Sequence, residues 1–170
     1  MALLFVTSSE HQIEVVVTCD PSVQANADQR ASYYKTGNLS DLEKVGEDAT
    51  KFILRGLSPS DREAAEIAAG AYTRSELGRL LWLEAPTDVR DRAKWHHELE
   101  DDEKTALSEY TSYLNRVYVE MIRVSLVSID GEPASFEMID NIKPEGDRTQ
   151  AISELVLHIQ RISLLGDEGK

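Results

Sequence analysis

The chain has 170 residues, and its 18 lysines and arginines stand against 31 aspartates and glutamates, which gives a formal net charge of −13. Nucleic-acid binding draws its affinity from clustered basic side chains, so this charge argues against nucleic acid as a direct partner. A chain of this length with 41% hydrophobic residues can bury the core of a single domain, residues 1–170. Its one cysteine, Cys19, allows no internal disulfide and fits a reducing compartment.

The sequence predicts neither a membrane span nor a targeting segment. The longest apolar runs, Val15–Val17 and Leu80–Leu83, are far shorter than the ~20 residues that a membrane helix needs. Residues 1–6 are apolar, but they lack preceding basic residues and are too few for a signal peptide. We therefore expect no association with a membrane.

The N-terminal part, residues 1–57, predicts a small antiparallel sheet. Ala2–Thr7 and Gln12–Thr18 are short runs rich in Val, Ile and Phe, and they flank a polar segment in the manner of a hairpin. A third extended run, Thr50–Leu57, is expected to join this hairpin. Residues 22–46 are polar and lack a sustained period, which predicts a long connection with a helical turn near its end.

The remaining residues, 58–170, predict a helical part. Its first helix has a capping serine, Ser58, followed by a proline at the first helical position. The strongest element runs from Asp102 to about Leu126, where apolar residues recur in steps of three and four over roughly 37 Å. The last helix extends from Asp147 to Leu165, with Gly166 as its C-cap. The predicted fold is α+β and mostly helical, with a small N-terminal antiparallel sheet packed on a helical C-terminal part.

Residues 87–102 are dominated by charge and predict a solvated linker with a weak short helix. His96 with Glu100, or His97 with Asp101, would share one helix face, and these pairs give the chain's only suggestion of a metal site. Each pair lacks a third ligand at a convincing spacing. Charge runs usually face water, so we expect no metal and no other cofactor.

The sequence carries no recognisable catalytic motif. Cys19 has no histidine at a spacing that marks a base for a thiolate, which favours a small buried hydrophobic residue over a nucleophile. Gly70 and Gly78 lack the flanking glycines and the Lys-Ser/Thr pair of a phosphate-binding loop. Nucleophile-elbow and zinc-protease motifs are absent as well. We therefore expect a protein that is not an enzyme.

The apolar faces of the two longest predicted helices favour a protein partner. Three tyrosines lie on or beside the stripe of the long helix, and tyrosine is favoured where a surface is both packed and wet. The domain offers few other elements to cover two long apolar faces, which points to assembly with another protein or with a second copy of the chain. The candidate partner-binding residues are Tyr110, Tyr113, Val117, Tyr118, Met121, Leu155, Ile159 and Ile162.

The segment 50–70 joins an extended run, Thr50–Pro59, to an acidic, alanine-rich helix that begins Asp61-Arg62-Glu63-Ala64-Ala65-Glu66. This arrangement resembles small proteins of tailed bacteriophages, in particular the tail assembly chaperones. The resemblance implies a protein that binds the extended tape-measure protein and recruits tail-tube subunits in the host cytoplasm. It implies no catalytic residues.

The main alternative is a structural subunit of the virion, such as a head–tail connector, a decoration protein or a baseplate component. A host-directed phage regulator or a bacterial adaptor domain forms a third class. An assembly chaperone is expected to be absent from purified particles, whereas a structural subunit is present in fixed copy number. The protein content of purified virions therefore separates the first two classes.

Overall fold

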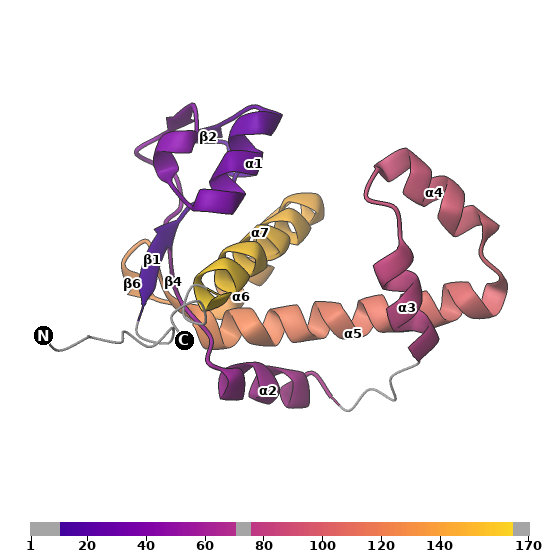
Figure 1. Cartoon of the computed structure of the whole chain (residues 1–170). Helices are drawn as coiled ribbons and strands as arrows, with labels where there is room; N and C mark the ends of the chain where they lie inside the picture. The colour runs from indigo at the N-terminus through magenta and orange to yellow at the C-terminus, as the bar shows by residue number, and fades with distance from the viewer. Residues whose placement is uncertain (1–10, 71–75, 165–170) are drawn as a thin grey trace, which may run out of the picture. The chain divides into compact units, whose positions relative to one another are not determined.

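The computed structural model describes residues 11–70 and 76–164 and shows an α+β chain that is mostly helical (Figure 1). A four-stranded antiparallel sheet and one long helix confirm the fold class that the sequence predicts. A second, two-stranded sheet pairs β2 (Val23–Gln24) with β3 (Lys44–Val45).

The chain divides into two compact units. The larger unit contains the chain up to Ala65 and from Tyr118 onward, and the smaller unit is Glu66–Val117. The division between the units falls within residues 58–170, the part of the chain that the sequence predicts to be helical.

The sheet of the larger unit has the strand order β1-β4-β5-β6, and all its neighbouring strands are antiparallel. β1 (Gln12–Val15) and β4 (Phe52–Arg55) lie within two of the predicted extended runs and pair directly with each other. The predicted strand Ala2–Thr7 lies outside the described residues. The sheet is not confined to the N-terminal part, because β5 (Leu126–Ile129) and β6 (Glu132–Pro133) complete it.

An Asp-Gly turn joins β5 to β6. Asp130 and Gly131 have φ angles of 50° and 82°, the left-handed backbone that tight two-residue hairpin turns require. Asp130 Oδ1 accepts a hydrogen bond from the N–H of Lys51 at 2.8 Å, and the Asp130 N–H donates to the Lys51 carbonyl oxygen at 2.9 Å. These bonds fix the turn beside the start of β4.

The long connection predicted for residues 22–46 is wrong, because this segment contains α1 (Ala27–Thr36) and a 3-10 turn, η1 (Leu39–Asp41), as well as β2 and β3. Asn26 and Gln29 form a capping box at the start of α1, with both hydrogen bonds at 2.9 Å. Tyr33 is the fully buried residue of this helix. With one buried side chain, α1 has no apolar stripe for a periodicity search to detect.

Helix α7 (Glu145–Leu164) is central to the larger unit and contacts α1, α6 (Phe136–Asp140) and β4. It begins two residues before the predicted start, and the predicted C-cap Gly166 lies outside the described residues. Its apolar stripe packs into the core of the unit. The largest fully buried apolar side chains of this core include Phe52, Leu54, Leu57, Ile122, Ile139, Leu155, Ile159 and Ile162.

All the regular secondary structure in the described residues of the smaller unit is helical. It contains the end of α2 (Pro59–Ala68), then α3 (Glu76–Glu84) and α4 (Val89–Glu98). α5 (Asp101–Ser125) confirms the long helix predicted from Asp102 to Leu126, and its first four to five turns belong to this unit.

Candidate protein-binding surface

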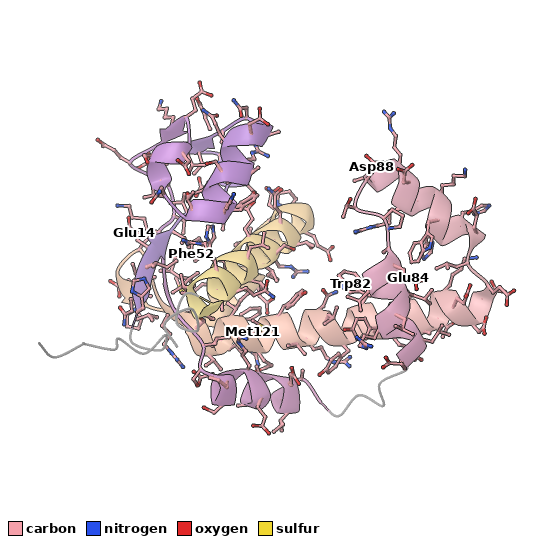
Figure 2. The ribbon with its side chains drawn as sticks, viewed as in Figure 1. Glu14, Phe52, Trp82, Glu84, Asp88 and Met121 are labelled. Atoms are coloured by element: carbon pink, nitrogen blue, oxygen red, sulfur yellow. The ribbon has the colours of Figure 1, made fainter. Side chains whose placement is uncertain are left out.

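The smaller unit has an apolar groove of about 320 Å³, and both tryptophans of the chain line it. Trp82 comes from α3, and Trp95 comes from α4 (Figure 2 shows Trp82 on α3). Leu107, Ser108 and Ser112 are contributed by α5. We call this feature the tryptophan groove. Its remaining lining residues are Ala85, Arg92, His96 and Thr111.

A close helix contact holds α3 against α5 beneath the tryptophan groove. Gly78 is buried on α3, and a Cβ at this position would overlap the backbone oxygen of Ala106. The same Cβ would stand 3.0 Å from Cβ of Tyr110. Glycine therefore permits a separation between the two backbones that no larger residue allows, and this contact sets the position of Trp82 one turn further along α3.

Helix α4 is held by its own N-terminal contacts. The carboxylate of Asp88 accepts hydrogen bonds from the N–H groups of Arg90 and Asp91 at 2.8 and 3.1 Å, which caps the helix (Asp88 is labelled in Figure 2). Nε of Arg92 donates to the carbonyl oxygen of Pro86 at 2.8 Å. The weak short helix predicted in this charged segment is thus a complete helix with a defined start.

Exposed apolar side chains are concentrated in the smaller unit. Among the described residues, nine large hydrophobic side chains are exposed, and six of them lie between residues 66 and 117. Large contiguous apolar patches are uncommon on monomeric proteins, so this uneven distribution makes the smaller unit the candidate for an interaction surface. The six side chains are Ile67, Leu77, Leu80, Trp82, Leu83 and Val89, with exposed fractions from 37% to 81%.

The structure separates the candidate partner-binding residues into a buried set and a half-buried pair. Leu155, Ile159 and Ile162 are at most 1% exposed, which places them in the core of the larger unit and corrects their assignment to a partner surface. A further three candidates, Tyr113, Val117 and Met121, are 6% to 8% exposed and therefore also packed. Tyr110 and Tyr118 are half-buried.

The assignment of the α7 residues to a partner surface failed for a physical reason. Helical periodicity identifies which face of a helix is apolar, but it does not show what covers that face. α7 is covered by α1, a helix that the periodicity did not reveal. The tryptophan groove contains a residue type that anchors protein interfaces more often than aliphatic residues do.

A buried carboxylate on α7 is completely paired. Glu154 is 3% exposed, and its oxygens accept hydrogen bonds from the N–H of Thr18 at 2.6 Å, from the hydroxyl of Thr18 at 2.8 Å and from Nε2 of Gln150 at 2.7 Å. These bonds attach the segment that follows β1 to α7. The pairing is structural, because both carboxylate oxygens are hydrogen-bonded and the side chain is almost completely buried.

One helical turn further along α7, His158 is fully buried. Its Nδ1 lies 3.2 Å from a guanidinium nitrogen of Arg161, and its ring centroid lies 4.8 Å from that of Tyr33. Burial, together with the positive charge of Arg161, lowers the pKa of His158 from 6.5 to about 4. The imidazole is therefore neutral at physiological pH. Closed off from solvent, it cannot serve a substrate as an acid or a base.

Cys19 is half-buried, and its thiol donates to the carbonyl oxygen of Asp147 at 3.5 Å. Burial raises the pKa of this thiol to about 11, and the charges of Glu154 and Asp147 add to the effect. Almost none of the thiolate exists at neutral pH. This agrees with the expectation that Cys19 is not an activated nucleophile.

His96 lines the tryptophan groove, where the sequence suggested a metal ligand. Across residues 11–70 and 76–164, no three His, Cys, Asp or Glu side chains are grouped so that they could hold a metal ion. In the same ranges, every helix is too short or too polar to traverse a lipid bilayer.

Comparisons with known protein families, with curated proteins and with solved structures found no match to this chain. The class of protein is therefore defined by the structure itself. It is an α+β protein, mostly helical, with an apolar groove and a group of exposed hydrophobic side chains in one of its two units.

Proposed function

We propose that this chain is a non-enzymatic protein of a tailed bacteriophage that binds another phage protein during tail assembly, as a tail assembly chaperone does. The observation that supports this most directly is the concentration of exposed apolar side chains in the smaller unit, the unit whose groove is lined by both tryptophans. Such surfaces are typical of protein interfaces. The family resemblance of residues 50–70 supplies the phage context.

The partner that fits the tryptophan groove is an amphipathic helix. Helices bind in apolar grooves by inserting side chains from positions three and four residues apart. The lining includes the guanidinium of Arg92 and the imidazole of His96 and no carboxylate, so acidic side chains beside the partner's apolar stripe are accommodated. A tape-measure protein, long and helical, presents stripes of this kind.

Co-expression with the tape-measure protein of the same phage genome tests this proposal. We expect the two proteins to co-purify in a constant ratio. Trp95→Ala removes an anchor of the groove and is expected to weaken the complex by about 2 kcal/mol, or about 30-fold in the dissociation constant.

A second variant separates binding from folding. Ser112 is exposed at the groove, so Ser112→Arg fills the groove while leaving the apolar packing intact. Leu157→Ala is the matched control, because Leu157 is 44% exposed in the larger unit. We expect Ser112→Arg to abolish co-purification and Leu157→Ala to preserve it. Equal behaviour of the two variants would show that the groove is not the contact.

Mass spectrometry of purified virions distinguishes a chaperone from a structural subunit. A chaperone leaves before the particle is complete, so we expect no peptides of this chain in purified virions. Recovery at a fixed copy number relative to the major tail protein would assign the chain to the virion instead.

A further inference from the structure

The larger unit contains a separate pocket of about 400 Å³, beside the start of α7. Its buried lining is apolar and includes Val17, Phe52 and Ile129, each no more than 5% exposed. Met138 also lines the pocket and is 43% exposed. The volume lies within the range of pockets that enclose small ligands or single large side chains.

The polar lining of this pocket is mainly acidic. Asp20, Asp130 and Asp147 contribute three carboxylates, and Lys143 contributes one ammonium group. The carboxylates come from three places in the fold, namely the segment after β1, the β5–β6 turn and the first turn of α7. The pocket thus combines an apolar interior with an excess of negative charge.

Two of these carboxylates are held in position by backbone hydrogen bonds. The oxygens of Asp20 accept from the N–H groups of Ser22 at 2.8 Å and Thr50 at 2.9 Å. Partial burial opposes ionisation of Asp20, but these bonds outweigh it and hold the pKa of its carboxyl below the usual value. Asp130 is fixed by the bond from Lys51 described above. The charge is therefore preorganised before any ligand arrives.

We propose that this pocket binds the side chain of an arginine or lysine presented by a partner protein. The aliphatic stem of such a side chain matches the apolar interior, and its cationic head matches the carboxylates. That the cation belongs to a protein rests on the proposed function. The pocket itself is independent of the tryptophan groove, since all its lining residues belong to the larger unit.

Two peptides that differ in one charge test the proposal on the full chain. The first is acetyl-Leu-Arg-Leu-amide, and the second replaces the arginine by citrulline, which keeps the shape and removes the charge. Binding is followed through backbone amide NMR shifts. We expect the arginine peptide to shift the resonances of the pocket, and the citrulline peptide to bind at least about fivefold more weakly. Equal binding of both peptides would overturn the proposal.

Substitutions of the carboxylates supply the second arm. Asp130→Asn preserves an oxygen that can accept the Lys51 hydrogen bond and tolerates the positive φ, so it removes the charge alone. With Asp147→Asn added, we expect about tenfold weaker binding of the arginine peptide. Asp91→Asn, on the smaller unit, is the matched control and should leave binding unchanged. An equal loss in the control would refute a specific site.

Cys19 provides a second readout, because it lines the pocket and is the single cysteine of the chain. The arginine peptide at ten times its dissociation constant should slow alkylation of Cys19 by iodoacetamide about tenfold, since about one pocket in eleven stays empty. An alkylation rate of Cys19 that is the same with and without the peptide at that concentration would contradict occupation of the pocket.

A small organic cation is the alternative source of the charge. If the diamine putrescine saturates the pocket at a concentration at least tenfold below that of the arginine peptide, the assignment to a partner protein is overturned. None of these measurements involves the tryptophan groove. The pocket can therefore fail its test while co-purification through the groove succeeds, and the reverse also holds.

Discussion

His158 is the residue whose environment has the clearest consequence for the behaviour of the protein. It is fully buried against Tyr33, with Arg161 beside Nδ1, and its Nε2 has no hydrogen-bond partner among the described residues. A positive charge on this ring would be both desolvated and next to another cation. Folding therefore requires the neutral imidazole.

The free energy of unfolding is expected to decrease as the pH falls, because His158 is harder to protonate in the folded chain than in the unfolded chain. The pKa of His158 is about 4 in the folded chain and 6.5 ordinarily, so the unfolded chain binds the extra proton first as the pH falls. The contribution of His158 to the free energy of unfolding is retained above pH 6.5. It decreases toward pH 4, by about 3 kcal/mol at most. Urea unfolding at pH 7.5 and 5 measures this loss.

His158→Gln is the control for that measurement, because glutamine is polar but does not titrate. The carboxylates of the chain change the free energy of unfolding equally in both proteins over this pH range. We expect the wild type to lose about 2 kcal/mol more than His158→Gln between pH 7.5 and 5. Parallel pH profiles of the two proteins would rule out His158 as the source.

Glu154 represents the opposite arrangement, a buried charge that is kept because it is fully hydrogen-bonded. Glu154→Ala removes three accepted bonds and leaves the buried N–H of Thr18 without its partner, which costs about 2 to 3 kcal/mol. Glu154→Gln retains one acceptor oxygen and is expected to lose less. Chemical denaturation ranks the three proteins. An alanine variant as stable as the wild type would contradict this account of the contact.

At the scale of elements, the packing of α3 on α5 depends on one glycine. Gly78→Ala places a methyl group on the backbone oxygen of Ala106, so the two helices must separate. We expect a destabilisation of about 1 to 3 kcal/mol, confined to the smaller unit. Hydrogen exchange measured amide by amide should show faster exchange in α3.

Gly146→Ala is the matched glycine substitution, since a Cβ at Gly146 meets nothing within 4 Å. It lies in the first turn of α7 and is expected to leave the stability unchanged or raise it by up to about 1 kcal/mol. The same response from both glycine variants would mean that the close contact at Gly78 does not hold α3 in place.

The elements that could be predicted from the sequence are those with a long apolar period. α5 and α7 bury whole stripes of side chains, and both were located to within about two residues. α1 was not found, because its stability comes from the Asn26 capping box and one buried tyrosine rather than from a stripe. β5 is a four-residue strand directly after a helix, where a helical period and a strand cannot be told apart.

For the candidate site, the sequence predicts that apolar side chains are exposed but not which ones. The sequence indicates more apolar surface than the predicted elements cover, and the described residues do expose such side chains. The exposed side chains are not the predicted ones: the candidates on α7 and three of the five on α5 are packed, because what covers a helix face is a long-range contact that no local pattern encodes. The tryptophan groove depends in the same way on three helices that meet only in the folded chain.

At the scale of the whole molecule, the two units have different characters. The larger unit contains both sheets and an internal polar cluster, and it exposes three of the nine large hydrophobic side chains. The smaller unit is helical in its described residues and exposes the other six. Under the proposed function, the smaller unit supplies the main contact with a protein partner.

Fluorine NMR of the chain labelled with 5-fluorotryptophan tests this division most directly, because both tryptophans line the one groove. Single Trp→Phe variants assign the two resonances. On titration with the tape-measure protein, we predict that both resonances shift and saturate at the same partner concentration. A complex that forms while both resonances keep their free positions, or the absence of any complex, would contradict the assignment of partner binding to the smaller unit.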